Sequence, residues 1–470
     1  MAIEGRTHKP VIDYEKCSAC SVCIEACPAE IIPDMRTETD SLRGTIYSDV
    51  DTDIRINISK EFVSPPCQVA CPIDQDVRGY MRLIAEKHHK EALNLIRKTN
   101  PLPSVCGYVC HHPCELACIR SQVDEALSIK SLKRFAADYD NGEIEPTKTE
   151  KTQGKKIIII GSGPAGLTAA HELVKKGYIV EIIESYQEPG GMLAWAIPNF
   201  RLPKEILKRD IEYIRKMGVT IKTGISLGLD ATISDIKKDG ADAIILATGT
   251  QKSLKMRIEN EGNFKGFTDC LSLLKGYAHH DDIHLGNDVL IIGGGNAAID
   301  TARSAIRLGA EKVTILYRRG RNEMPADRDE VDEALAENVA LKFLTSPKRI
   351  IAENGIVKRL QCVKTRLIYD ADSDRPRPVN IDGSEFIINA STIISAVGQE
   401  PDFSWMEKDS SLEITRQNTL AVNDKTMMTD MKGVFAAGDN INGPTTVVEA
   451  MASGKKVAKS VDHYLSEERE

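Results

Sequence analysis

The chain lacks the features that mark a membrane protein, an exported protein or a nucleic-acid binder. No apolar run in its 470 residues approaches the roughly 20 that a membrane-spanning helix needs. The stretch from Met1 to Pro10 has no signal-peptide core. Basic residues do not outnumber acidic ones, since the formal net charge is −8, and they form no basic stripe. We therefore expect a cytoplasmic globular protein without a membrane or nucleic-acid partner.

Cysteine is scarce beyond residue 118, where only Cys270 and Cys362 occur. These two isolated thiols offer no C-x-x-C redox pair in the longer part of the chain. The remaining cysteines of the chain's 12 all lie between Cys17 and Cys118. Because the cytosol keeps thiols reduced, we do not expect so dense a group to form disulfides. Metal binding is the working hypothesis.

The first cysteines form a tight run, "CSACSVCIEACP", at residues 17–28. Cys17, Cys20, Cys23 and Cys27, followed by a proline, have the spacing of bacterial ferredoxins, in which the fourth cysteine usually serves another cluster. A zinc site also uses C-x-x-C pairs. Four cysteines at this spacing before a proline favour an iron–sulfur cluster over zinc.

Two features divide the rest of the chain. Residues 74–98 carry apolar side chains at a helical period, so small helices should separate the later cysteines. Residues 141–156 are polar and nearly free of aliphatic side chains, which is typical of a linker. Beyond them, short aliphatic runs alternate with helical stretches, as in a buried parallel sheet with crossover helices. We expect an α/β body behind a mainly helical, cysteine-rich part.

A dinucleotide-binding motif begins this body: "KKIIIIGSGPAGLTAAHELVKKGYIVEIIE". A strand ends at Gly161, the loop carries Gly163 and Gly166, a helix opens at Pro164, and Glu184 ends the next strand. Glycines admit a pyrophosphate to the backbone, the helix start offers N–H groups to it, and the acid can accept from ribose hydroxyls. A plain glycine turn is the alternative, but strand, helix and acid all stand in register.

A second copy, "NDVLIIGGGNAAIDTARSAIRLGAEKVTILYRRGRNEMPA", has Gly293 and Gly295 in the loop and an alanine in place of the third glycine. No acid ends the following strand; Arg318 and Arg319 stand there, with Arg321 close by. Guanidinium groups can bind a 2′-phosphate, which a carboxylate would repel. The pattern favours NADP(H) over NAD(H), unless the arginines only form a solvated turn.

One dinucleotide site has an acid after its second strand and the other has arginines there. This difference suggests two different dinucleotides, one bound permanently and one exchanged. "ATG" at 247–249 and "GVFAAGDNINGPTTVVEAMASGKKVA" at 433–458 resemble the flavoproteins with two dinucleotide-binding domains, in which FAD occupies the first site. By that resemblance Asp439 binds the ribityl chain, and the helix start near Thr446 and Val447 directs its positive end at the flavin. The expected cofactor-binding residues are Gly161, Gly163, Pro164, Ala165, Gly166, Glu184, Gly191, Thr248, Gly249, Gly293, Gly295, Asn296, Ala297, Arg318, Arg319, Gly398, Gly438, Asp439, Thr446 and Val447.

Longer segments sharpen the resemblance. "EPGGMLAWAIPNFRLPKEIL" (188–207), "YRRGRNEMPA" (317–326) and the terminal segment look like the small (β) subunit of NADPH-dependent glutamate synthase. Residues 66–120 resemble both that subunit and the N-terminal part of dihydropyrimidine dehydrogenase. The resemblance covers about residues 60–465 and implies an electron path between NADPH, FAD, [4Fe-4S] clusters and a partner active site. Hydride transfer needs stacking more than an acid or base, so we expect no catalytic side chain.

The chain departs from these relatives in its cysteines, because the C-x-x-C pair expected shortly before Cys67 is absent. By resemblance to the pyrimidine enzyme, Cys71, Cys110 and Cys114 belong to one cluster, Cys67 and Cys118 to another, and Cys106 to none. Its glutamine ligand corresponds to Lys133, which cannot be a ligand, so the fourth ligand stays open, with Cys27 a candidate. We expect two or three [4Fe-4S] clusters, with ligands among Cys17, Cys20, Cys23, Cys27, Cys67, Cys71, Cys110, Cys114 and Cys118.

The predicted fold class is α/β, with two nested Rossmann-like domains behind a mainly helical iron–sulfur domain. The predicted boundaries are a ferredoxin-like segment at 1–45, a helical iron–sulfur domain at 46–150, FAD-binding segments at 151–280 and 391–470, and an NAD(P)-binding domain at 281–390. The favoured function is an electron-transfer subunit serving a partner enzyme or ferredoxin. The alternatives are the glutamate synthase small subunit itself, a flavin disulfide reductase, and a complex-organising subunit without redox function.

Overall fold

The computed structural model describes residues 64–140, 144–146, 154–369, 375–406 and 411–467, together with the backbone of four short strands before them. Those strands are β1 (Ile3–Glu4), β2 (Val11–Ile12), β3 (Gly44–Ser48) and β4 (Ile54–Ile58). The ferredoxin-like run at 17–28 lies outside the described residues. None of the described helices is long and apolar enough to cross a membrane.

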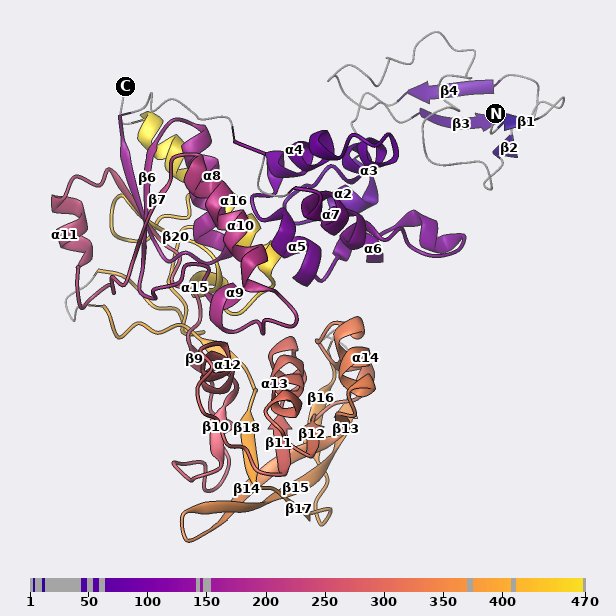
Figure 1. Cartoon of the computed structure of the whole chain (residues 1–470), viewed down its shortest axis with the longest axis vertical. Helices are drawn as coiled ribbons and strands as arrows, with labels where there is room; N and C mark the ends of the chain where they lie inside the picture. Colours follow the sequence, from indigo (N-terminus) through magenta and orange to yellow (C-terminus); the bar gives the residue numbers. More distant parts are fainter. Residues whose placement is uncertain are drawn as a thin grey trace.

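Residues 64–140 form a helical part, here called the iron–sulfur part. In Figure 1 it lies beside the upper of two α/β parts, which is the first α/β part described below. The segment expected to be helical at 74–98 forms two helices, because Lys87 has a positive φ of 66° and interrupts the winding. Asp76 caps the first of them, accepting from the Gly79 N–H at 2.9 Å. The helices are α2 (Pro66–Val69), α3 (Val77–Ala85), α4 (His89–Thr99), α5 (Pro103–Val109), α6 (Pro113–Leu116), η1 (Ile119–Gln122) and α7 (Ile129–Asp138).

The first α/β part, residues 154–251 and 401–467, contains a parallel sheet of order β20-β8-β5-β6-β7. Its central strands are runs of buried isoleucine, as a sheet covered on both faces requires. Helices α8 and α16 pack together on one face. The elements are β5 (Lys156–Ile160), α8 (Pro164–Lys175), β6 (Ile179–Glu184), α9 (Met192–Trp195), α10 (Lys204–Lys216), β7 (Thr220–Thr223), α11 (Ile233–Lys238), β8 (Ala243–Leu246), β20 (Val434–Ala436), α15 (Asp439–Asn442) and α16 (Val447–Glu467).

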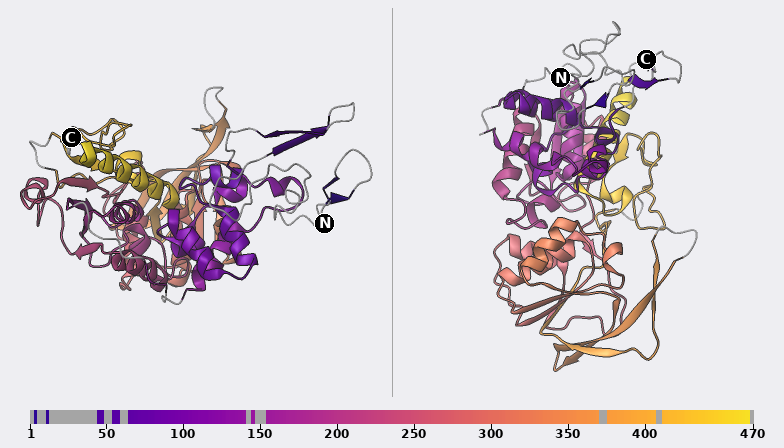
Figure 2. Two further views of the ribbon diagram at one scale, coloured as in Figure 1. Left: turned by 90° about the horizontal axis from the view of Figure 1, so that it is seen from above. Right: turned by 90° about the vertical axis from the view of Figure 1, so that its right-hand side faces the viewer.

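The second α/β part, residues 254–398, repeats this plan with a parallel sheet of order β10-β18-β11-β12-β13 and adds an antiparallel sheet of β14, β15, β16 and β17. The long β14–β15 ribbon lies at the far end of the molecule (Figure 2). The elements are β10 (Phe267–Asp269), α12 (Cys270–Ala278), β11 (Asp288–Ile292), α13 (Asn296–Arg307), β12 (Lys312–Leu316), η2 (Arg321–Glu323), α14 (Arg328–Ala336), β13 (Ala340–Lys342), β14 (Thr345–Glu353), β15 (Ile356–Ile368), β16 (Arg377–Asn380), β17 (Phe386–Asn389) and β18 (Thr392–Ser395).

The strand pairing moves two of the boundaries expected from the sequence. The expected boundaries at 280 and 391 would assign β10 and β18 to the first α/β part. In the structure, however, both strands pair within the sheet of the second α/β part. The two crossings between the α/β parts lie instead at β9 (Lys252–Ser253) and β19 (Gln399–Glu400), which pair antiparallel. Each crossing is polar but only a few residues long and directly follows an aliphatic strand, so it cannot be recognised as a linker in the sequence. The short aliphatic runs expected to be strands form β5, β6, β8, β11, β12, β18 and β20, and the α/β class is confirmed.

The iron–sulfur part and the first α/β part share one hydrophobic core. The Asp210 carboxylate on α10 accepts from the Val105 N–H at the start of α5, at 3.0 Å. At the other end of the chain, Lys455 on α16 donates to the Ile73 carbonyl at 3.0 Å. The C-terminal helix therefore completes the packing of the N-terminal part.

Candidate cofactor sites

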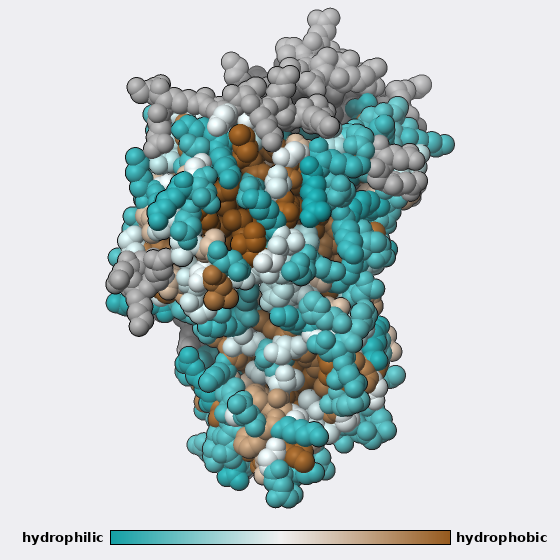
Figure 3. Space-filling model, turned by 60° about the vertical axis from the view of Figure 1, so that its left-hand side comes forward, coloured by the Kyte–Doolittle hydropathy of each residue, from teal (hydrophilic) through white to brown (hydrophobic). Residues whose placement is uncertain are grey.

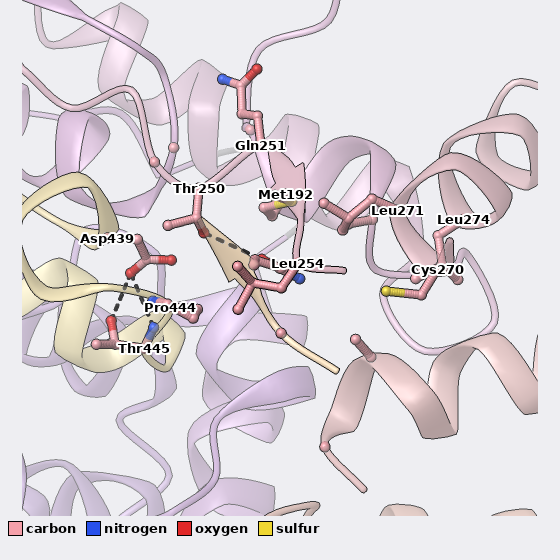
Figure 4. A pocket seen from close by; sticks show the side chains of 18 of the residues that line it. Met192, Thr250, Gln251, Leu254, Cys270, Leu271, Leu274, Asp439, Pro444 and Thr445 are labelled. Atoms are coloured by element: carbon pink, nitrogen blue, oxygen red, sulfur yellow. Dashed lines mark hydrogen bonds between the residues drawn. The ribbon is translucent and has the colours of Figure 1, made fainter. Parts of the chain in front are cut away.

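A single cavity of about 1550 Å³ runs between the two α/β parts and reaches the iron–sulfur part. Every cofactor-binding residue expected from the sequence lines it, except Gly166. The surface view shows apolar side chains gathered between polar rims in the upper lobe (Figure 3). In the close view, the polar Asp439 and Thr445 lie on one side and the apolar Leu271 and Leu274 on the other (Figure 4). The structure thus brings both predicted dinucleotide sites to one space.

The first glycine loop leaves room where a pyrophosphate would lie. A Cβ added to Gly163 would meet nothing within 4 Å. A Cβ on Gly161 would come within 2.3 Å of the Ala247 carbonyl oxygen, and Gly161 also has a φ of +104°. Gly166 faces away from the cavity, where its Cβ would lie 2.0 Å from the Gly161 carbonyl oxygen. The loop can therefore approach a phosphate while α8 packs tightly on β5.

The second loop has the same geometry. A Cβ on Gly295 would meet nothing within 4 Å, whereas one on Gly293 would lie 2.2 Å from the Ala396 carbonyl oxygen. No side chain caps the N-terminus of α8 or of α13, so both helix starts present open N–H groups to the cavity. Both loops fit a dinucleotide.

Glu184, at the end of β6, is partly committed to holding the first loop. Its Oε2 accepts from the Ser162 N–H at 2.9 Å and from the Ser162 hydroxyl at 2.6 Å. Its Oε1 accepts from the Tyr186 N–H at 2.9 Å. The carboxylate is 5% exposed and lines the cavity, where it can still accept from a ribose hydroxyl.

Three guanidinium groups gather at the end of β12. Burial lowers the pKa of Arg318, and the neighbouring charge of Arg319 lowers it further. Arg319 donates through Nε to the Pro376 carbonyl at 2.9 Å. Arg375, which sequence reasoning missed, also lines the cavity and donates to the Tyr317 hydroxyl at 2.8 Å. Within the described residues no carboxylate is among the charges that act on Arg318, whereas Arg321 pairs with Asp332 at 2.9 Å, so Arg318 and its two arginine neighbours fit a 2′-phosphate.

Replacing both Arg318 and Arg319 by glutamine should lower kcat/KM for NADPH roughly a hundredfold, or about 3 kcal/mol, and leave that for NADH nearly unchanged. Two charge-assisted hydrogen bonds to the 2′-phosphate are lost, and NADH carries no such group. Steady-state reduction of a dye with each nucleotide measures the effect. Equal losses with both nucleotides would mean that the arginines only support the fold.

The region expected to face the flavin contains an acid that sequence reasoning did not identify. Thr446 donates through its hydroxyl to Glu449 at 2.7 Å and through its N–H at 2.9 Å. Glu449 therefore caps the start of α16 and offsets the positive end of that helix. Asp439 accepts from the Thr445 hydroxyl at 2.7 Å, and burial raises its pKa to about 6. The S/T-x-x-E pattern at 446–449 is the sequence signal that could have revealed the cap.

Four of the described cysteines lie on or directly after two short helices with the same local pattern. Pro66–Cys71 and Pro113–Cys118 both read P-C-x-x-A-C, and the helices α2 and α6 that they form pack against each other. Each starts with proline and closes with matching bonds, from the Ala70 N–H to the Pro66 carbonyl at 2.9 Å and from the Ala117 N–H to the Pro113 carbonyl at 3.1 Å. This repeat, also missed from the sequence, supplies Cys67, Cys71, Cys114 and Cys118.

The thiols fit an iron–sulfur centre by their chemistry and their burial. Burial raises the pKa of Cys110, and that of Cys114 to about 12, so a metal must replace the proton of each. Burial also raises the pKa of Cys67, as does the neighbouring Cys118 thiolate. Soft thiolates in a water-poor setting are the ligands of iron–sulfur clusters. Cys67 thus lies near Cys118, the two cysteines expected to serve the same cluster.

Lys133, on α7, lies near the thiols of Cys71, Cys110 and Cys114, which are expected to share one cluster, and it is only 3% exposed. Burial opposes its charge, but the neighbouring thiolates of Cys106, Cys110 and Cys71 raise its pKa above the ordinary value. The protonated ammonium cannot donate a lone pair to iron. The fourth ligand of this group stays a prediction, since Cys27 lies outside the described residues.

Family comparisons assign the three segments. The pyridine nucleotide-disulphide oxidoreductase profile matches residues 155–454, the profile of dihydropyrimidine dehydrogenase domain II with a 4Fe-4S cluster matches 61–144, and a 4Fe-4S binding domain matches 10–32. Among solved structures, FprA of Mycobacterium tuberculosis in complex with NADPH aligns with a TM-score of 0.60 at 17% identity, over 67% of this chain and 86% of that one. At that identity the likeness shows the fold alone.

Three curated relatives share more of the sequence. The NADP(+)-dependent formate dehydrogenase subunit beta of Moorella thermoacetica is 41% identical over 86% of this chain and 60% of its own length. The NADPH-Fe(3+) oxidoreductase subunit beta of Geobacter sulfurreducens is 38% identical over 86% and 64%. This chain thus spans less than two thirds of either. The glutamate synthase [NADPH] small chain of Azospirillum brasilense is 32% identical over 94% and 96%.

The last match spans nearly the whole of both chains, and the profile match covers both α/β parts with their glycine loops. FAD, a nicotinamide dinucleotide and [4Fe-4S] clusters are therefore the cofactors of this chain, and its reaction is an NAD(P)H-dependent oxidoreduction. The chain belongs to the pyridine nucleotide-disulphide oxidoreductase family, as a relative of the glutamate synthase small chain with an additional 4Fe-4S binding segment near its N-terminus.

Proposed function

We propose that this chain is the electron-transfer subunit of a larger oxidoreductase, and that it moves electrons between NADP(H) and a partner protein through FAD and [4Fe-4S] clusters. The first glycine loop would hold FAD and the second NADP(H). The partner would be another enzyme subunit or a ferredoxin. The clustered thiols, which need a reducing compartment, support a cytoplasmic location.

One observation carries this proposal: the cavity that joins both glycine loops also reaches the residues on either side of Cys110. Val109 and His111 line that cavity, and Cys110 stands between them in the chain. Cys110 is 6% exposed and closes the C-terminus of α5. A cluster bound there would lie beside the dinucleotide space without opening it to water.

The chain's own residues bind, orient and exclude water in this scheme. The open N-termini of α8 and α13 would bind the two pyrophosphates, and Asp439 would bind a polar part of the FAD chain. Leu271 and Leu274 make one side of the cavity apolar. Bound FAD supplies the exchange between a two-electron hydride and the single electrons that clusters carry. No described side chain needs to act as an acid or base.

The alternative readings differ in what they need from the chain. A flavin disulfide reductase needs a pair of cysteines near the flavin, but Cys270, which lines the cavity, has no second thiol in the α/β parts except Cys362 in β15. A complex-organising subunit would not need the open space above Gly163 and Gly295. The near full-length match to a glutamate synthase small chain supports the remaining alternative, that this chain is itself a glutamate synthase small subunit.

Removal of residues 1–45 tests the proposal. Flavin content and NADPH-driven flavin reduction should persist, because both glycine loops lie far beyond the deletion and fold on their own core. Iron should fall by about four atoms if one cluster depends on Cys17–Cys27, and electron delivery to a ferredoxin should fall with it. Anaerobic purification, iron analysis and a ferredoxin-reduction assay give the readouts.

Reduction of a small dye directly by the flavin serves as the control and should survive the deletion. Full iron content with undiminished delivery to ferredoxin would contradict an exit role for the ferredoxin-like run.

A further inference from the structure

A loop of the first α/β part crosses the cavity and forms buried ion pairs with the second. Arg201, between α9 and α10, contacts Asp300 on α13 through Nη1 and Oδ2 at 2.5 Å, and Glu330 on α14 through Nε and Oε1 at 3.0 Å. The three side chains are 8%, 5% and 11% exposed. Burial raises the pKa of Asp300 and Arg201 lowers it, so the arginine favours the charged carboxylate.

The residue before Arg201 strengthens the same contact. The Phe200 ring lies 3.9 Å from the guanidinium carbon of Arg307 and 4.8 Å from that of Arg303, both on α13. Both guanidinium groups are held by Glu337, through contacts of 2.6 and 2.9 Å. The first part thus holds α13 by an ion pair and by a cation–π contact within two consecutive residues.

The loop that presents Arg201 is rigid. The Arg201 N–H donates to the Pro198 carbonyl at 3.0 Å. The Lys204 ammonium donates to the Ile197 carbonyl at 2.6 Å and to the Leu193 carbonyl at 3.1 Å. Pro198 and Pro203 restrict the backbone on either side. Arg201 therefore has a fixed position from which to hold the second part.

This contact lies close to the second glycine loop, on the lining of the cavity that both dinucleotide sites share. Asp300 is one turn beyond Asn296, where α13 begins at the second glycine loop, and both Arg201 and Asp300 line the shared cavity. Among the described residues, the chain passes between the two α/β parts at the crossings at β9 and β19 alone. Two paired strands of two residues each give little resistance to twisting, so side-chain contacts must fix the angle between the parts.

We propose that Arg201, Asp300 and Glu330 form a clamp that fixes the NADP(H) site against the FAD site and so positions the two cofactors for hydride transfer. The inference rests on the proposed assignment of the two sites. In the step itself, a hydride leaves NADPH, which becomes NADP⁺, and enters FAD, which becomes the reduced flavin anion; no further reactant is needed. The clamp residues are positioning residues, since a misplacement of about 1 Å can slow such a step roughly a hundredfold.

Arg201→Gln in the full-length holoprotein tests the clamp. Asp300 then loses the cation that pairs with it, Glu330 keeps only its contact with Arg303 on α13 at 3.0 Å, and the contact between the two α/β parts loosens. In anaerobic stopped-flow experiments, the limiting rate of flavin reduction at saturating NADPH should fall about tenfold to a hundredfold. The apparent Kd for NADPH should change less than about threefold, because the second glycine loop and its arginines are intact. The charge-transfer absorbance between nicotinamide and flavin should weaken in parallel.

Arg359→Gln is the matched control, because it removes an ion pair with Glu353 that lies wholly within the second part. It should leave both rate and Kd unchanged. If Arg201→Gln does not retain flavin, Arg201→Lys carries the test: lysine keeps the charge but loses the fork that reaches two carboxylates, and the limiting rate should fall at least about fivefold.

Three results separate the possible outcomes. An unchanged limiting rate in a flavin-replete Arg201 variant overturns the clamp. A raised Kd with an unchanged limiting rate also overturns it, because Arg201 would then bind nucleotide rather than position it. Absence of NADPH-driven flavin reduction in the unmodified protein would overturn the proposed function instead.

Discussion

Gly163→Val should give a folded protein almost without flavin. Gly163 has a φ of −67°, which valine tolerates, and a Cβ there meets no protein atom within 4 Å. The new side chain would instead fill the space of the FAD pyrophosphate. The expected result is an iron content near that of the unmodified protein, an unchanged thermal transition of the apoprotein, and a flavin absorbance close to zero. Unchanged flavin content would remove FAD from the first loop.

Gly295→Val is the matched variant in the other loop. Gly295 has a φ of −92°, and its added Cβ is equally free of protein contacts. This variant should keep its flavin and iron but lose flavin reduction by NADPH, while photoreduction of the flavin persists. Loss of flavin in both variants would mean that the two loops do not bind separate cofactors.

If Cys110 is a cluster ligand, as we propose, Cys110→Ala should remove about four iron atoms from the purified protein, because one [4Fe-4S] cluster then lacks a ligand. Flavin should remain and should still be reduced by NADPH. Transfer from the flavin to ferredoxin should fall below a few per cent, since the first cluster of the path is missing. Iron analysis, electron paramagnetic resonance after dithionite and the ferredoxin assay report these effects separately.

Cys106→Ala provides the comparison within the same helix. Cys106 is fully buried, and its Sγ lies 3.6 Å from the Met451 Sδ on α16. If Cys106 is not a ligand, as the resemblance implies, its replacement should leave the iron in place and cost only the packing of one sulfur. A loss of about four irons would make Cys106 the fourth ligand of the Cys71, Cys110 and Cys114 group.

Much of the α/β body is predictable because its signals are local. An isoleucine run such as 157–160 can only be a buried strand or a buried helix, and the glycine loop after it selects the strand. Pro164 marks the start of α8 because its missing N–H costs nothing there. Local steric rules of this kind identify the two loops and place Arg318 and Arg319 at the end of β12.

The features that could not be predicted from the sequence depend on contacts between residues far apart in the chain. Arg201 meets Asp300 only after the two parts pack, and the residues between them carry no sign of the pairing. Arg375 joins Arg318 because the segment before β16 returns to the end of β12. β10 has three residues, too few to show an alternating or buried pattern, so its place beside β18 follows from the sheet rather than from its own composition.

The packing of α16 also has a consequence for the order in which the protein assembles during synthesis. Residues 64–140 leave the ribosome before α16, but their inner face packs against Met451 and Lys455 on that helix. Until that helix emerges, Cys106 and the carbonyl of Ile73 lack their partners. A growing chain therefore exposes the apolar inner face of its iron–sulfur part until α16 has been made. Iron–sulfur loading that takes place before that point would occur on an incomplete core, so the core of the iron–sulfur part is completed only when α16 packs against it.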